Sequence, residues 1–274
     1  MRSRPFGCTG VDVPLIGIGT WKMERDDSAA AVAALRRAIE LGMSHVDTAE
    51  MYGNGLVEMI VREAIAGVRD RLFLTSKVLP SNATHEGVIH ACEDSLARMK
   101  TDYLDLYLLH WRGDTPLGET FGAFEALREQ GKIRAWGVSN FDTDDLTQAL
   151  VEAGPNKIAC NQVLYHLGDR TIEHEVIPWC ERNGVAVVAY SPFGSRRGFP
   201  KSQALAMLAQ ELDATPRQLA LAFLAQKSFV IPKSSNVQHV EQIAGAGELE
   251  LDADTIAAID AAFPLGPWRG LPSI

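Results

Sequence analysis

The 274-residue chain lacks several features that mark whole classes of proteins. Its four cysteines (Cys8, Cys92, Cys160 and Cys180) include no C-x-x-C pair, which favours isolated thiols over a disulfide framework. Basic residues are in deficit, and the net charge of −9 argues against nucleic acid and anionic membranes as partners. No window approaches the roughly 20 apolar residues of a membrane span, and no apolar run follows residues 1–5 as in a signal peptide. We therefore expect a cytoplasmic protein.

The chain does contain enough apolar sequence for a large core. It is 46% hydrophobic and 22% charged, and its length suits one α/β barrel of about 250 residues. Apolar runs repeatedly lead into polar residues and then into an amphipathic helical pattern. Strict alternation of strands and helices predicts a parallel sheet covered by helices. Eight such units without a linker predict a (β/α)8 TIM barrel of class α/β, a single domain over residues 1–274.

The element boundaries follow from the same patterns. Strands are predicted at 15–19, 45–47, 72–77, 104–110, 133–139, 158–162, 185–190 and 229–232. The first helix is expected to begin near Asp26, Asp27 or Ser28 and to stop at Gly42. Later helices are expected at 57–66, 84–99, 117–130, 143–153, 170–183, 202–226 (with a break near Pro216 left open) and 237–246. An N-terminal β-hairpin, Phe6–Cys8 and Val11–Val13 around Thr9-Gly10, and an extra C-terminal helix at 252–262 complete the prediction.

Polar side chains fall at or just after the carboxyl ends of the predicted strands. They are Asp47, Lys77, His110, Ser139, Asn140, Gln162, Tyr190, Ser191 and Lys233. In a parallel barrel these strand ends surround one mouth, where active sites lie. Each residue alone could be a helix cap or a loop residue, but together they predict one site.

The stretch from Asp47 to Gly53 resembles the signature of the aldo-keto reductases, with Asp-Thr-Ala followed by Tyr-Gly. The resemblance covers nearly the whole chain, and the overall pattern looks like that of bacterial members that use small aldehydes such as methylglyoxal. It implies a catalytic tetrad of Tyr52, Lys77, Asp47 and His110. Tyr52 would donate a proton, Lys77, paired with Asp47, would lower the pKa of the phenol from about 10, and His110 would orient the substrate carbonyl.

Other segments resemble the cofactor-binding parts of the same family, namely G-V-S-N at 137–140, A-Y-S-P at 189–192 and I-P-K-S at 231–234. The resemblance implies NADPH, with polar groups on the carboxamide, a tyrosine ring against the nicotinamide and a lysine on the 2′-phosphate. The residues expected to bind it are Gly19, Thr20, Trp21, Asp47, Ser139, Asn140, Gln162, Tyr190, Ser191, Pro192, Phe193, Lys233, Ser234, Ser235, Asn236, His239 and Gln242.

The chain departs from the family pattern at the adenine end of this site. Many members have arginine, glutamate and asparagine where this chain has His239, Gln242 and Ile243. NADPH remains the expected cofactor, with NADH as a weaker alternative. Arg196 and Arg197 could add charge near the phosphates, although a solvated pair is the preferred interpretation.

Substrate preference is predicted from the residues around the mouth. Trp21, Trp111 and Met51 are expected to line the pocket. The loop at 111–116 and the tail after Phe263 are short, which favours a wide mouth and broad use of small aldehydes and 2-oxoaldehydes such as methylglyoxal. We expect a monomer whose partner is a small carbonyl substrate.

The sequence also bears on a metal site and on two alternatives to a reductase. A metal site is not predicted, because His85 and His90 are one residue too far apart for a zinc helix. A Schiff-base lyase using Lys77, or a phosphate-binding barrel, gives no use to Ser139, Asn140 and Gln162. A non-catalytic NADPH-sensing regulatory subunit would bind the cofactor tightly and turn over slowly.

Overall fold

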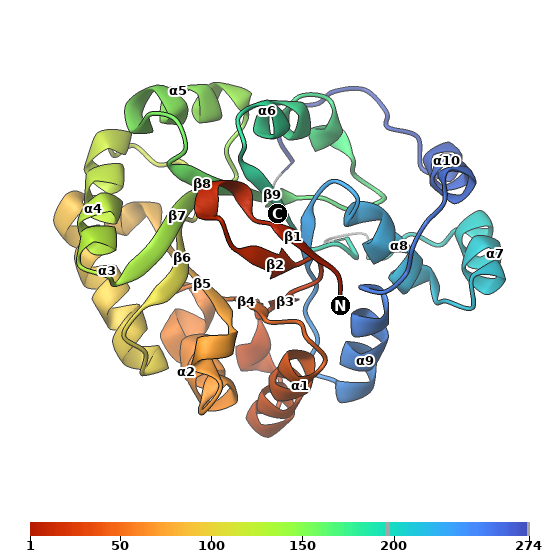
Figure 1. The fold of residues 1–274 in the computed structure, drawn as a ribbon, viewed down its shortest axis with the longest axis horizontal. Coiled ribbons are helices and arrows are strands. Elements are labelled where there is room, and N and C mark those ends of the chain that lie inside the picture. Colours follow the sequence, from red (N-terminus) through yellow and green to blue (C-terminus); the bar gives the residue numbers. More distant parts are fainter. Residues whose placement is uncertain (195–197, 273–274) are drawn as a thin grey trace.

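The structure, a computed structural model, describes residues 1–194 and 198–272 and confirms the predicted (β/α)8 barrel (Figure 1). Eight parallel strands hydrogen-bond to one another in chain order. They are β3 (Ile18–Gly19), β4 (His45–Asp47), β5 (Phe73–Val78), β6 (Leu104–Leu109), β7 (Ile133–Ser139), β8 (Ile158–Leu164), β9 (Ala186–Tyr190) and β10 (Phe229–Ile231). Apart from β3, which is shorter than predicted, the strand bounds agree with the prediction to within two residues.

The barrel closes between its first and last strands. Ile16 forms a parallel bridge with Val230, and the Gly19 amide donates to the Pro232 carbonyl at 2.9 Å. A Cβ at Gly19 would lie 2.8 Å from the Ile231 carbonyl oxygen. Because any side chain would separate the two strands, closure requires glycine here.

Helices cover the outside of the barrel (Figure 1). They are α1 (Ser28–Glu40), α2 (Leu56–Ile65), α3 (His85–Met99), α4 (Leu117–Glu129), α5 (Thr143–Ala153), α6 (Val176–Arg182), α7 (Gln203–Glu211), α8 (Pro216–Leu224), α9 (Val237–Gly245) and α10 (Ala253–Ala262). Asp27 is the N-cap of α1, because its carboxylate accepts from the Ala30 amide at 2.8 Å. Within the described part of the chain, no helix is long and apolar enough to cross a membrane.

The break near Pro216 that the sequence left open in the 202–226 segment is present. The segment forms α7 and α8, because Thr215 and Gln218 make a capping box and Pro216 starts a new first turn. One helix prediction needs correction. The helix predicted at 170–183 is shorter. A 3-10 turn (Thr171–Glu173) precedes α6, and the Glu173 carboxylate in this turn accepts from Arg170 and from the distant Lys227.

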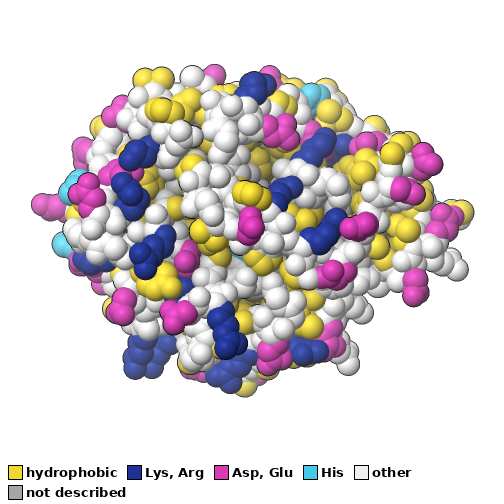
Figure 2. Space-filling model, in the orientation of Figure 1, with side chains coloured by type: hydrophobic (Ala, Val, Ile, Leu, Met, Phe, Trp, Pro, Cys, Tyr) yellow, Lys and Arg dark blue, Asp and Glu magenta, His cyan; other side chains and the backbone are white. Residues whose placement is uncertain are grey.

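The N-terminal hairpin is confirmed, but its first strand was placed too late. The antiparallel strands are β1 (Ser3–Pro5) and β2 (Asp12–Pro14), and Gly7–Thr9 is a 3-10 turn. Phe6 is fully buried, with its ring 4.9 Å from that of Phe73 and 4.7 Å from that of Phe229. Since Phe73 and Phe229 begin their strands, the hairpin covers the amino end of the barrel, as Figure 1 shows. On this face basic and acidic side chains are interspersed (Figure 2).

His45, at the start of β4, should make the stability of the fold sensitive to acid. Burial lowers its pKa to about 4, against a weaker opposing effect of Asp47. The folded state therefore keeps His45 neutral while the unfolded chain takes up a proton below about pH 6.5, so stability is full above that pH and falls as the pH drops toward 4. Between pH 7 and pH 5, His45 should lower the free energy of unfolding by about 2 kcal/mol.

We expect His45→Leu to reduce this loss, measured as the free energy of unfolding in urea at the two pH values. The exposed His90→Gln serves as the control for losing an imidazole. Equal pH dependence in the wild type and in His45→Leu would contradict the expectation.

Candidate active site

A cavity of about 860 Å³ lies at the carboxyl end of the barrel, opposite the hairpin. This volume is within the range of small-molecule sites. Of the residues predicted to form the site, it is lined by Gly19, Thr20, Trp21, Asp47, Met51, Tyr52, His110, Trp111, Ser139, Asn140, Gln162, Tyr190, Ser191, Pro192, Phe193 and Lys233. The convergence of strand ends on one mouth, predicted from the sequence, is thus what the barrel produces.

A buried ion pair lies beneath the cavity. The Lys77 ammonium is 2.6 Å from Asp47 Oδ1 and donates to the Thr48 carbonyl at 2.8 Å. Gln162 Nε2 donates to the other oxygen, Asp47 Oδ2, at 2.7 Å. Lys77 is fully buried and Asp47 is 2% exposed. Charges this deeply buried persist only when paired and hydrogen-bonded, which is the case for both.

Tyr52 lies directly above Lys77, whose Nζ is 3.3 Å from the phenol oxygen. The residues after it, Gly53, Asn54 and Gly55, all have positive φ, and a Cβ at Gly53 would lie 2.8 Å from that of Glu24. This left-handed turn brings the chain sharply away from Tyr52 and leaves its side chain against the cavity.

The pKa of Tyr52 moves in the direction opposite to the sequence-based expectation. Burial raises it, and although the charge of Lys77 offsets part of that effect, the net pKa is above its ordinary value. The pKa of Lys77 is also raised, because Asp47 and Tyr52 outweigh the effect of burial. The phenol is therefore protonated and the amine charged at neutral pH. The sequence-based expectation lacked the burial of the Tyr52 side chain, which sets the direction of its pKa shift.

His110 follows β6 and faces Tyr52, with ring centroids 5.8 Å apart. Burial and the charge of Lys77 lower its pKa to about 2, so the imidazole is neutral. Its Nδ1 is buried and has no hydrogen-bond partner among the described residues. The ring of Trp111 lies 4.9 Å from that of His110 and is 38% exposed, which makes it the outer wall of this corner.

Ser139, Asn140 and Tyr190 form one hydrogen-bonded set at the ends of β7 and β9. Tyr190 Oη donates to Asn140 Oδ1 at 2.8 Å, and Asn140 Nδ2 donates to the His110 carbonyl and to Ser139 Oγ. Ser139 Oγ in turn donates to the Gln162 carbonyl at 2.8 Å. Asn140 has a φ of 59°, a conformation that asparagine tolerates better than most residues. The set is preorganised, and its members already satisfy one another.

A second cavity of about 340 Å³ adjoins the first at Phe193 and Lys233. It contains three further residues predicted to bind the cofactor, Ser234, His239 and Gln242. The ammonium of Lys233 makes an ion pair with Asp26, and Ser235 Oγ donates to the same carboxylate at 2.7 Å.

Not every predicted cofactor residue lines these cavities. Ser235 binds Asp26, and Asn236 caps α9 by accepting from the His239 amide at 3.0 Å. Neither residue is part of a cavity wall. Arg196 and Arg197 lie outside the described residues.

Several residues that line the cavities were missed by sequence reasoning. Lys22 and Arg112 adjoin Trp21 and Trp111, so their positions next to predicted pocket residues were an available signal. Other missed residues are Gly194, Ile231 and Leu271 in the first cavity and Thr215, Arg217, Gln218 and Leu221 in the second, which also contains Ile243, the residue noted at the adenine end. The missed residues include three basic side chains, Lys22, Arg112 and Arg217, which make the site locally positive in an otherwise acidic chain.

Comparisons with known proteins agree with this geometry. The model of the aldo/keto reductase family matches residues 15–263. Methylglyoxal reductase YeaE of Escherichia coli strain K12 is 45% identical over 262 residues, 93% of this chain and 92% of that protein. Glyoxal reductase of Bacillus subtilis strain 168 is 34% identical over 255 residues, 92% and 90% of the two chains. The crystal structure of an aldo/keto reductase from Klebsiella pneumoniae in complex with NADP and acetate has a TM-score of 0.94 at 41% identity, with both chains fully covered.

Proposed function

This chain belongs to the aldo/keto reductase family of oxidoreductases, and we propose that it reduces small aldehydes and 2-oxoaldehydes with NADPH. The relatives named as methylglyoxal and glyoxal reductases support this substrate class. One observation carries the proposal. A protonated tyrosine, a buried lysine–aspartate pair and a neutral histidine meet at the base of a cavity large enough for a cofactor and a small substrate.

The residues divide the work of carbonyl reduction. When bound, NADPH supplies the hydride that adds to the carbonyl carbon. Tyr52 donates its phenolic proton to the carbonyl oxygen, and the charge of Lys77 stabilises the phenolate that remains. Asp47 keeps the ammonium of Lys77 in place and charged. Each role follows from a contact 2.6 to 3.3 Å long.

His110 positions the substrate oxygen. A neutral imidazole has one N–H, and only a ring nitrogen that reaches the cavity can donate it to a substrate. Nδ1 is buried, and Nε2 is the nitrogen that remains to serve the cavity, so we assign the proton to Nε2. From there it donates to the carbonyl oxygen that Tyr52 protonates.

The cavity suits a phosphorylated dinucleotide. Lys22, Arg112 and Lys233 line the first cavity and Arg217 the second, whereas the buried carboxylate at the base is neutralised by Lys77. Gln162 keeps Oε1 as an acceptor, because its Nε2 is the atom bonded to Asp47. A nicotinamide carboxamide has the donor that this oxygen needs.

The test of this function is NADPH oxidation with methylglyoxal, followed at 340 nm, alongside a direct measurement of NADPH binding. Turnover that depends on both reactants supports the proposal. Binding without turnover of any simple aldehyde would replace it with the cofactor-sensing subunit, and absence of NADPH binding would contradict both.

Two variants with opposite expected effects on NADPH affinity should test the phosphate site. We expect Lys233→Met to weaken NADPH binding by about 10- to 100-fold and NADH binding much less, because a charge-assisted hydrogen bond to phosphate is worth about 1.5–3 kcal/mol. Asp26→Asn should tighten NADPH binding, because the carboxylate of Asp26 competes with a phosphate for Lys233 and Ser235.

Binding constants for both cofactors, measured by quenching of protein fluorescence, check this pair. Lys157→Met removes the same charge at the opposite end of the barrel, where Lys157 pairs with Glu125, and is the matched control. Equal weakening of NADPH and NADH by Lys233→Met would show that Lys233 does not read the 2′-phosphate.

A further inference from the structure

Residues 263–272, the described part of the chain after α10, form no helix or strand, yet this segment returns to the cavity. Half of its residues are exposed, but Leu271 packs against the core and lines the first cavity. The sequence suggested that so short a tail would leave the mouth open, and Leu271 shows that part of it forms a wall. A segment without backbone ladders needs other contacts to hold it in one place.

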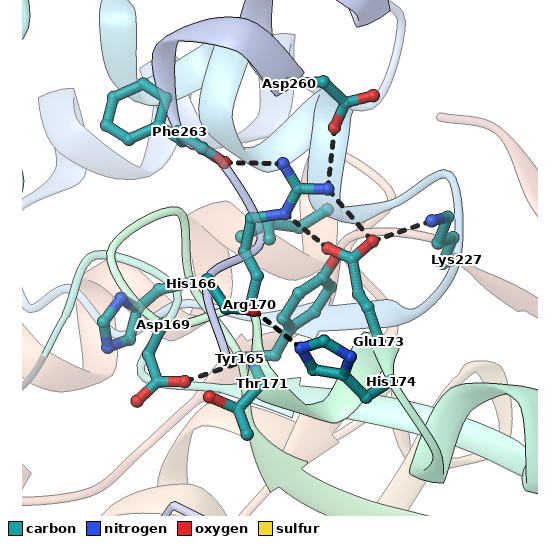
Figure 3. A network of polar contacts seen from close by, with 12 residues as sticks. Tyr165, His166, Asp169, Arg170, Thr171, Glu173, His174, Lys227, Asp260 and Phe263 are labelled. Atoms are coloured by element: carbon teal, nitrogen blue, oxygen red, sulfur yellow. Dashed lines mark hydrogen bonds and ion pairs between the residues drawn. The ribbon is translucent and has the colours of Figure 1, made fainter. Parts of the chain in front are cut away.

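Those contacts come from one loop, between β8 and α6. Arg170 Nη1 donates to the Phe263 carbonyl at 2.8 Å, and His174 Nε2 lies 2.8 Å from the Gly266 carbonyl oxygen. The ring of Trp268 lies edge-on to that of His174, with centroids 6.3 Å apart. Figure 3 shows Arg170 at the centre of this network, between Phe263 and Asp260 on one side and Glu173 on the other.

The Arg170 guanidinium is held in place by contacts other than its bond to the segment after α10. Its side chain is only 6% exposed, and its guanidinium bonds both oxygens of Glu173, at 2.5 and 3.0 Å, and Asp260 at 2.7 Å. Such a two-pronged pairing restricts the direction of the remaining N–H groups. The one on Nη1 is left pointing at Phe263.

Glu173 is in turn a fixed anion. Tyr165 Oη donates to one of its oxygens and Lys227 Nζ to the other, both at 2.8 Å. Burial alone raises the pKa of Glu173, but the hydrogen bonds from Arg170, Lys227 and Tyr165 lower it to about 2. The anchor for Arg170 is therefore charged at every pH at which the fold is expected to be used.

The network also connects the segment to the candidate active site. Tyr165 directly follows β8, the strand that carries Gln162, and the Tyr165 amide donates to the Tyr190 carbonyl at 3.4 Å. The strand β8 and the loop after it thus supply both Gln162, the partner of Asp47, and Arg170, which contacts the segment that carries Leu271.

From this arrangement we propose that Arg170 is a positioning residue that holds the segment after α10 so that Leu271 forms a wall of the substrate cavity. Arg170 touches neither cavity, so it acts on substrate choice through Leu271. The inference rests on the proposed function and extends it, because it assigns selectivity for the non-reacting part of the aldehyde to a distant ionic network.

The test compares Arg170→Met, Leu271→Ala and the double variant in NADPH oxidation with methylglyoxal and with the bulkier phenylglyoxal. Methionine keeps an apolar stem while removing the hydrogen bonds to Glu173, Asp260 and Phe263. We expect Arg170→Met to raise KM for phenylglyoxal about tenfold, as loss of one apolar contact does, with kcat and the KM for methylglyoxal little changed. If Arg170 acts through Leu271, the double variant has no higher KM than Leu271→Ala alone, whereas independent effects would multiply.

Lys227→Met is the matched control, because Lys227 bonds Glu173 from the exposed edge of the network and makes no contact with the segment. It should leave the ratio of the two KM values unchanged. A ratio unaltered in Arg170→Met, effects that multiply in the double variant, or a change confined to the KM for NADPH would each overturn the inference.

A readout independent of activity uses Arg269, which is exposed in the same segment. We expect trypsin to cleave after Arg269 faster in Arg170→Met and in His174→Ala than in the wild type, followed by mass spectrometry. His174→Ala serves if Arg170→Met does not fold, since it removes only the contacts with Gly266 and Trp268. Should the wild type turn over neither aldehyde, the proposed function fails, while unchanged cleavage in both variants would refute the anchoring itself.

Discussion

Tyr52→Phe is expected to lower kcat for methylglyoxal reduction by about 10² to 10⁴-fold, the range for loss of a general acid. The ring would keep its place above Lys77, whose Nζ lies 5.0 Å from the ring centroid, but no proton could pass to the carbonyl oxygen. NADPH binding should stay close to that of the wild type, because the lost hydroxyl is bonded only to Lys77 among the described residues. Steady-state kinetics together with cofactor binding separate the two effects.

Tyr107→Phe is the control for this change. Tyr107 is fully buried, whereas Tyr52 is partly exposed to the cavity; the Tyr107 hydroxyl has no hydrogen-bond partner in the described structure, and Tyr107 does not line the cavity. Its kcat should be that of the wild type. A Tyr52→Phe variant that kept most of its activity would show that another group or water protonates the substrate.

Lys77→Met is expected to reduce activity and to destabilise the fold by about 3–5 kcal/mol, because it leaves the carboxylate of Asp47 buried without its counter-ion. Gln162 and the Thr20 hydroxyl would still bond Asp47, at its side chain and its backbone carbonyl respectively, but neither carries charge. Denaturant unfolding at neutral pH measures the stability, and NADPH oxidation measures the activity.

Lys→Met at an exposed ion pair is the control for this loss of stability. Lys132 lies 2.6 Å from Glu93, and both side chains are partly exposed, so Lys132→Met should cost under about 1 kcal/mol. If Lys77→Met proved as mild as Lys132→Met, the Lys77–Asp47 pair would not be the buried, charged unit described above.

Much of the fold was predictable from the sequence because the signals are local. The strand from His45 to Asp47 was located to the residue, since an apolar run ends there in a carboxylate. The amino end of α5 at Thr143 was likewise located correctly, and its Asp142 cap is a short-range signal. The hairpin strand was misplaced because Phe6, read as part of a strand, is instead a buried plug whose partners Phe73 and Phe229 are far along the chain.

In the candidate site too, part was predictable from the sequence and part depended on tertiary packing. The chain's own order of residues determined that Asp47, Lys77, His110 and Gln162 would stand at strand ends, because a parallel barrel brings such ends to one mouth. The sequence alone therefore predicts that these residues lie close together.

The tertiary structure decided what each group experiences there. Burial raises the pKa of Tyr52 although Lys77 is adjacent, and the Asp26 carboxylate occupies Lys233. The return of Leu271 to the cavity depends on Arg170, 101 positions earlier in the numbering. Desolvation and contacts between distant segments depend on how the chain packs in three dimensions, and no local pattern of residue types encodes them.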